Sequence, residues 1–148
     1  MEDRYLFKAK RKDDGEWVIG NRIDDGVTGQ VFIHAVGNSV NESDKVGEEG
    51  CLQFVAFEVA PSTICQCAGL RDRNGKLIWE NDICDRKEEY PEIVKYNNGD
   101  WTLDYSYSKG KESGYCYCNL GFYVLERKHV EVIGNIFDNP ELLGRNGE

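Results

Sequence analysis

The sequence predicts a mainly β protein with short antiparallel strands, an N-terminal β lobe, a small barrel in the C-terminal half and at most short helical turns. Three observations favour this class. Apolar and polar residues alternate with a period of two, which is typical of strands. Turn-forming residues such as Asp-Gly and Asn-Gly separate the alternating runs, and no long amphipathic helical pattern occurs. Short strands with this spacing are typical of a small barrel or sandwich.

The N-terminal half predicts a hairpin followed by two further strands. Residues 5–9 alternate, residues 13–15 form an Asp-Asp-Gly turn, and residues 16–19 supply the second strand of the hairpin. The turn fits because Asp-Gly tolerates positive φ. Residues 31–36 predict a third strand. Residues 52–59 predict a fourth strand, which we expect to be central because it is apolar almost throughout.

Positions 37–50 are rich in polar residues and glycine, with Val40 and Val46 as the only large apolar residues, which predicts a mobile surface loop. The following Ala60-Pro61-Ser62-Thr63 segment breaks the strand pattern and gives the predicted internal boundary. We therefore expect a single domain over residues 1–148. The alternative is a pair of lobes, an N-terminal β lobe at 1–60 and the small barrel at 61–148.

The C-terminal half repeats the rhythm of strand and turn. Strands are predicted from residue 83, at 92–96, at 101–108 and at 130–137, and Asn97-Asn98-Gly99-Asp100 predicts a tight turn. The run from Trp101 to Ser108 alternates most cleanly. We expect three of its side chains, those of Trp101, Leu103 and Tyr105, to be buried in the core of the C-terminal barrel. There they should pack against Ile83, Val94 and either Ile133 or Ile136.

Two shorter segments complete the fold prediction. Glu80-Asn81-Asp82-Ile83 is similar to the entry of a small SH3-like barrel. Near the C-terminus, Asn139-Pro140-Glu141-Leu142-Leu143 fits an N-cap, a proline at the first helical position and one helical turn.

The six cysteines are the most reactive candidates. In a strand, residues i and i+2 share a face, so two Cys-x-Cys segments side by side could offer four thiolates to zinc. Structural zinc sites usually use Cys-x-x-Cys, and neither segment has that spacing. We expect reduced thiols, no metal and no cofactor, and leave open whether four of them meet in space: Cys65, Cys67, Cys116 and Cys118.

The other candidate motifs fail on spacing. Residues 69–77 place five residues between their glycines and a leucine where a phosphate loop needs a hydroxyl. The same segment puts Leu70 and Asn81 at the first and last ligand positions of a calcium loop. His34 and His129 lie in no metalloprotease motif, although a spatial pair of Cys51 with His34 stays open. We expect a hairpin turn at Asn74-Gly75, and no catalytic residue.

Two groups of side chains allow both a functional and a structural interpretation. An acidic run could gather a hard cation, but charge exposed at a barrel rim is commoner; it comprises Glu80, Asp82, Asp85, Glu88 and Glu89. An aromatic set could stack nucleic-acid bases, but core packing is favoured because Lys and Arg are not interleaved with it; it comprises Trp79, Trp101, Tyr105 and Tyr107.

Composition limits the partners. The net charge of −9 and the isoelectric point near 4.8 disfavour direct nucleic-acid binding. An acidic surface could also imitate the phosphates of DNA. No apolar run is long enough for a membrane span and the start of the chain is charged, so we expect a cytoplasmic protein that does not bind membranes.

The ordered set of short motifs resembles the YopX-like proteins of bacteriophages and prophages. The resemblance rests on the opening Gly15–Gly20 segment, on Gly69-Leu70 with Asn74-Gly75-Lys76, on Glu80–Ile83, and on the ending from Glu131 to Leu143. Departures are Asn81, where the family commonly has glycine, and the paired cysteines. The resemblance implies a small SH3-like barrel in the C-terminal half and supplies no catalytic residues.

These observations favour a phage or prophage accessory protein that acts in the cytoplasm of its bacterial host. We expect a non-enzymatic binding module with a protein partner, which could come from the host, and a homo-oligomer is compatible with the sequence. The alternative is an acidic DNA mimic that inhibits a nucleic-acid-binding protein of the host.

Overall fold

A computed structural model describes residues 3–35, 55–87, 90–109 and 117–144. The chain forms two compact units, and the boundary between them in the sequence falls between Gln66 and Cys67. The segment from Ala60 to Thr63, at which we predicted an internal boundary, lies in the first unit. It forms a short helical turn, η4, at Pro61–Thr63. The predicted loop at 37–50 falls outside the described residues.

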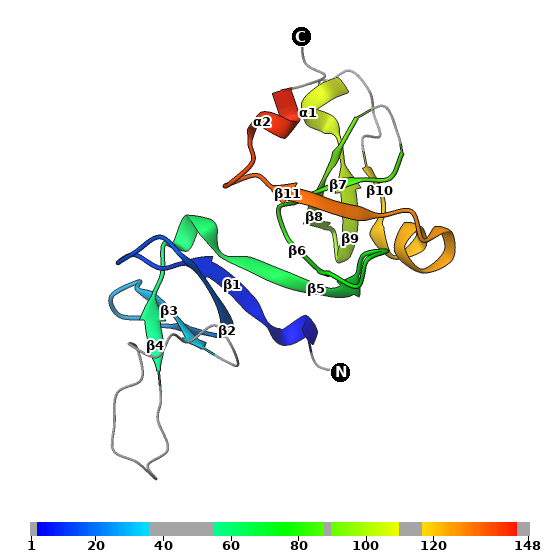
Figure 1. Ribbon diagram of the computed structural model, residues 1–148. Helices are drawn as coiled ribbons and strands as arrows, with labels where there is room; N and C mark the ends of the chain where they lie inside the picture. Colours follow the sequence, from blue (N-terminus) through cyan, green and yellow to red (C-terminus); the bar gives the residue numbers. More distant parts are fainter. Residues whose placement is uncertain (1–2, 36–54, 88–89, 110–116, 145–148) are drawn as a thin grey trace. The chain divides into compact units, whose positions relative to one another are not determined.

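The first unit is an antiparallel sheet preceded by a helical turn (Figure 1). The predicted N-terminal hairpin is confirmed, because β1 pairs with β2 from Phe7↔Gly20 to Lys10↔Trp17. The start of β5 also pairs with β1, through Phe7↔Gln66 and Lys8↔Cys65. The elements of this unit are η1 (Asp3–Tyr5), β1 (Phe7–Lys10), β2 (Trp17–Asp24), β3 (Val31–Ala35), β4 (Ala56–Glu58) and η4.

The fourth strand differs from the prediction. We expected a central strand at 52–59, but its described part, β4, forms a ladder with β3 on one side and has half-buried residues throughout. On its other side it has the isolated bridge of Val59 with Arg11 and a bond from the Lys12 amide to the Glu58 carbonyl. The apolar residues of the run are used in packing, because Val59 belongs to the core of this unit and Phe57 packs against it. Phe57 also lies against the Arg11 guanidinium, 3.9 Å from ring centroid to Cζ.

Alternating side chains of β1, β2 and β3 make the core of the first unit. Its buried members are Ala9, Val18, Val31, Ile33, Ala35 and Val59. Gly20 belongs to the same layer and admits no side chain, because a Cβ there would lie 1.8 Å from the carbonyl oxygen of His34.

The second unit contains an open antiparallel sheet with the order β10-β9-β8-β7-β11. A closed barrel would join the two outer strands, and no such pairing exists among the described residues. The expected SH3-like barrel is therefore replaced by an open sheet. The elements are the rest of β5 (Cys65–Arg71), β6 (Leu77–Trp79), β7 (Asp82–Asp85), β8 (Glu92–Asn97), β9 (Asp100–Asp104), α1 (Ser106–Lys109), β10 (Tyr117–Asn119), η5 (Phe122–Arg127), β11 (Glu131–Asn135) and α2 (Glu141–Gly144).

Tight turns join the strands where the sequence predicted them. Asn98 and Gly99 both have positive φ, 51° and 84°, which suits a two-residue hairpin loop between β8 and β9. The Asn74-Gly75 turn joins β5 to β6, with Gly75 at a φ of 84°. Asn81, between β6 and β7, also has a positive φ of 71°.

Two strands end earlier than the alternation predicted. β9 stops at Asp104, whose carboxylate accepts a hydrogen bond from the Ser106 amide at 2.7 Å and starts the helical turn α1. β11 stops at Asn135, whose side-chain oxygen accepts bonds from the amides of Phe137 and Asp138. Short polar side chains often end a regular element in this way.

The core of the second unit agrees with only part of the prediction. Ile83, Val94 and Leu103 are fully buried, whereas Ile133 is 38% exposed. Of the two alternatives, Ile133 therefore lies outside the core, because the register of β11 shifts between Val132 and Gly134 and breaks the expected alternation. Ile136 is half buried. The buried cluster contains Ile78, Cys84, Val94, Leu103, Leu120 and Val130, with Trp101 packed at its margin.

The helical turn near the C-terminus is confirmed, but its cap is different. The helix α2 begins at Glu141, after Pro140. The Asn139 side-chain oxygen accepts a bond from the Asn135 amide at 3.2 Å, so this side chain closes the preceding turn.

Replacing Trp101 with alanine should lower the free energy of unfolding by about 3 kcal/mol, the low end of the usual penalty for a large aromatic, because the ring is only half buried. Trp101 also makes an edge contact with Tyr96, with 5.1 Å between ring centroids. Tyr96→Ala is the matched control and should cost less, since Tyr96 is 54% exposed. A thermal-shift measurement tests this, and an unchanged melting temperature for Trp101→Ala would contradict it.

Candidate functional site

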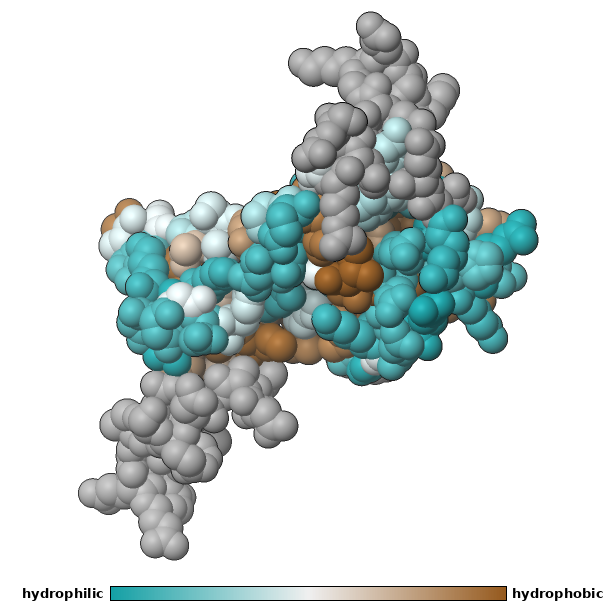
Figure 2. Space-filling view, turned by 45° about the horizontal axis from the view of Figure 1, so that its top comes forward, coloured by the Kyte–Doolittle hydropathy of each residue, from teal (hydrophilic) through white to brown (hydrophobic). Residues whose placement is uncertain are grey.

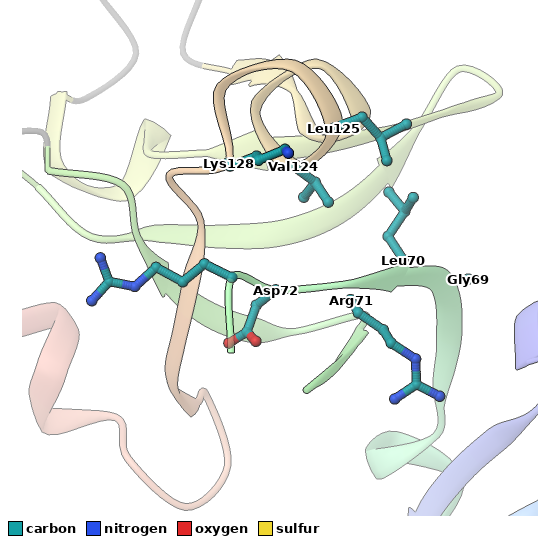
Figure 3. A pocket seen from close by; sticks show the side chains of 8 residues that line it. Gly69, Leu70, Arg71, Asp72, Val124, Leu125 and Lys128 are labelled. Atoms are coloured by element: carbon teal, nitrogen blue, oxygen red, sulfur yellow. The ribbon is translucent and has the colours of Figure 1, made fainter. Parts of the chain in front are cut away.

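An open groove of about 660 Å³ lies in the second unit, between the end of β5 and the helix η5. Figure 3 shows Leu70 and Leu125 directed toward each other across it, with Val124 beside them. The residues that line it are Gly69, Leu70, Arg71, Asp72, Arg73, Val124, Leu125 and Lys128.

The strand side of the groove departs from a regular ladder. The pairing of β5 with β6 shifts between Cys67↔Trp79 and Arg71↔Leu77, so the segment between them bulges. Gly69 within it has a φ of 77°, a conformation that costs a residue with a side chain about 1–2 kcal/mol. The bulge thus depends on glycine and directs Leu70 toward the helix (Figure 3).

Asp72 fixes the turn below the groove. Its two carboxylate oxygens accept hydrogen bonds from three backbone amides, those of Asn74, Lys76 and Val132, each at 2.9 Å. Burial alone would raise the pKa of Asp72, but the amides of Val132, Lys76 and Asn74 outweigh it and hold that pKa below its usual value. This carboxylate is consequently a poor proton acceptor and serves the structure.

The helix side was not predicted from the sequence. η5 is a wide helical turn, and Lys128 caps its C-terminal end. Lys128 adopts the left-handed conformation with a φ of 55° and donates its amide hydrogen to the Tyr123 carbonyl. Lysine in this conformation is uncommon. This backbone conformation positions Lys128 along the groove. The Lys128 side chain makes no salt bridge with any residue in the described ranges.

Exposed apolar side chains gather on this helix. Leu125 is 62% exposed and Phe122 is 43% exposed, with the Arg127 guanidinium 5.5 Å from the Phe122 ring centroid. Leu70 and Val124 are half buried and rest on the core of the second unit. On the face drawn in Figure 2, by contrast, hydrophilic residues cover most of the surface and hydrophobic ones form small patches.

The cations that line the groove differ in their partners. The Arg71 guanidinium points away from Leu70 (Figure 3) and donates to the Gly75 carbonyl at 2.9 Å. Arg73 forms a salt bridge with Glu131 at 2.8 Å. Among the described residues that line the groove, none carries a hydroxyl, thiol or imidazole group. Its chemistry is suited to binding an apolar group beside a negative charge.

The described cysteines have different hydrogen-bond partners. Cys65 and Cys67 are both buried in β5; the Cys65 thiol donates to the Thr63 carbonyl at 3.3 Å, and the Cys67 sulfur accepts a bond from the Gly69 amide at 3.4 Å. The Cys118 sulfur accepts a bond from Arg86 at 3.3 Å. Burial, together with the nearby charges of Asp82 and Asp72, raises the pKa of Cys84, so its thiol stays neutral. Cys51 and Cys116 lie outside the described residues, so neither the zinc arrangement nor the Cys51–His34 pair is seen.

The remaining candidates take structural roles where they are described. Asp82, from the acidic run, is 2% exposed and accepts a bond from the Trp79 amide, so it is not a solvated rim charge. Trp79 is 5% exposed, which confirms core packing for that ring. His129 is exposed. Within the described ranges, no three His, Cys, Asp or Glu side chains gather in a way that could hold a metal ion.

A buried ion pair lies near the helix η5. Arg86 pairs with Glu92, and their side chains are 9% and 2% exposed. The guanidinium also lies over the Tyr123 ring, 4.2 Å from its centroid. Burial alone would lower the pKa of Arg86, but the bond to Glu92 raises it, so the pair stays charged. We interpret this pair as a structural anchor of the helix.

Comparisons with known proteins identify the class of this protein. The profile of the YopX protein family matches residues 6–144, so the chain belongs to the YopX family. Its fold is similar to the X-ray crystal structure of the protein YopX from Bacillus subtilis, with a TM-score of 0.53 and 19% sequence identity over 95% of this chain and 98% of that one. A search of curated proteins finds no match.

One further feature concerns membranes. None of the helices in the described part of the chain has the length and apolar character to cross a membrane.

Proposed function

We propose that this protein is a phage or prophage accessory protein that binds a partner protein through the groove between β5 and η5, without catalysing a reaction. The observation that carries the proposal is the exposed Leu125 facing Leu70 across a groove of about 660 Å³. Exposed apolar side chains that gather in one patch are typical of an interaction surface, and Phe122, 43% exposed on the same helix, adds to the apolar surface of Leu125. The part of the lining that the structure describes carries no hydroxyl, thiol or imidazole group, which favours binding over catalysis.

Replacing Leu125 with glutamate should abolish capture of the partner from a lysate of the host bacterium. The change removes the apolar contact and places a charge in the groove, while leaving the exposed site free of folding strain. Val27→Glu is the matched control, because Val27 is 94% exposed in a turn of the first unit. The measurement is quantitative mass spectrometry of proteins retained by each variant.

The outcome separates the two functions considered. A protein retained by the wild type and by Val27→Glu, but not by Leu125→Glu, supports the groove. The net charge of −9 favours the acidic DNA mimic as a second candidate. A mimic would retain nucleic-acid enzymes equally on all three proteins and release them as salt rises, because salt screens exposed charges. If Leu125→Glu retains the same partner proteins as the wild type, the groove proposal is contradicted.

A further inference from the structure

The groove joins an aliphatic cleft to a cation. Leu70, Val124 and Leu125 form the apolar part and carry no aromatic ring. A leucine, isoleucine or methionine side chain fits such a surface, whereas nucleic-acid bases need flat rings on which to stack. Apolar side chains are therefore the better match for this part.

The charges along the groove are mostly positive in a chain that is acidic as a whole. Arg71, Arg73 and Lys128 line it. Among the described residues of the lining Asp72 alone carries a carboxylate, and its oxygens accept hydrogen bonds from three backbone amides. Arg73 is neutralised by Glu131, so Lys128 is the cation best placed to meet a ligand charge. The net charge of −9 over the whole chain repels a short acidic segment much less than a polyanion, because the repulsion grows with the charge of the ligand.

From these features we infer that the groove takes an acidic peptide segment of the partner, with an aliphatic side chain between Leu70 and Leu125 and a carboxylate on the Lys128 ammonium. The inference rests on the proposed function and specifies the chemistry of its partner. Complementary charge of this kind sets specificity and the rate of association more than affinity.

The test is selection of short random peptides from a display library on the full-length wild-type protein. We expect selected peptides to place Asp or Glu beside Leu, Ile or Met. A fluorescent copy of one such peptide should bind Lys128→Glu about tenfold more weakly. Lys128→Arg keeps the charge and should retain binding, and Val27→Glu should be indistinguishable from the wild type. Circular dichroism melting of each variant establishes that it is folded.

Different failures have different meanings. Selected peptides that are neutral or basic, and that need Leu125 but not Lys128, would overturn the acidic partner while leaving the groove as a binding site. Peptides whose binding is indifferent to both residues would overturn the binding function of the groove as well. Binding of a single-stranded thymidine oligonucleotide that is lost in Lys128→Glu would replace the peptide with nucleic acid.

Discussion

Replacing Arg86 with alanine should lower the free energy of unfolding by about 3–5 kcal/mol, because it leaves the charge of Glu92 buried without its ion-pair partner. Glu92 is 2% exposed, so water reaches it poorly. The substitution also removes the contacts of the guanidinium with Tyr123 and with the Cys118 sulfur. Urea unfolding followed by circular dichroism measures the loss.

The control for this prediction is removal of both charges together. The double variant Arg86→Met with Glu92→Leu replaces the pair with apolar groups of similar volume, and such exchanges are often neutral or stabilising. We expect it to recover most of the stability that Arg86→Ala loses. A double variant as unstable as the single one would show that the guanidinium contacts, not the buried charge, determine the loss.

Replacing Asp72 with asparagine should cost about 3 kcal/mol, since hydrogen bonds to a charged acceptor contribute about 1.5–3 kcal/mol each and an asparagine NH₂ group would face at least one amide donor. Asp25→Asn is the matched control. Asp25 also accepts bonds from turn amides, those of Val27 and Thr28, but on the surface of the first unit. We expect a much smaller change there, measured by the same urea unfolding.

The same variant has a signature in acid. The pKa of Asp72 is lowered in the folded protein, so its stabilising contribution is present above its usual pKa of 3.8 and is lost as the pH falls through the lower folded value. Asp72→Asn lacks this contribution and should lose less stability than the wild type as the pH falls below about 5. If the free energy of unfolding fell equally for the two proteins as the pH is lowered, Asp72 would not contribute to the pH dependence of stability.

Local backbone constraints explain why much of the fold could be predicted. The hairpin of β1 and β2, the Asn74-Gly75 turn and the Asn98-Gly99 turn each depend on residues that tolerate positive φ. That preference belongs to the residues themselves, so it is readable in the sequence. The period of two similarly indicated strands before their partners were known.

The strand ends and the closure of the sheet were predicted wrongly because the same sequence pattern is compatible with two different structures. An alternating run cannot show that Asp104 will cap α1 and end β9, because aspartate is also acceptable on the solvent face of a strand. Short strands and turns build open sheets as readily as barrels, so the open edges of the second sheet were not predictable. Closure depends on pairing between distant strands.

The groove was missed for a related reason. Its two sides come from residues 69–73 and from residues 124–128, which meet only in the folded unit. In the sequence, Leu125 is indistinguishable from a core leucine, although it is 62% exposed. The only local hint was the aromatic and apolar segment before Arg127, which follows Gly121 without a strand period.

Asn81 illustrates how distant relatives can share this architecture. Its φ of 71° is a backbone shape that glycine and asparagine both adopt, so asparagine can stand where the resemblance to YopX-like proteins leads us to expect glycine. The Asn81 side chain adds a contact of its own, because its oxygen accepts a hydrogen bond from the Lys95 ammonium at 3.0 Å. Many different sequences satisfy the same set of angles, which is how a chain 19% identical to its Bacillus subtilis relative can keep the same fold.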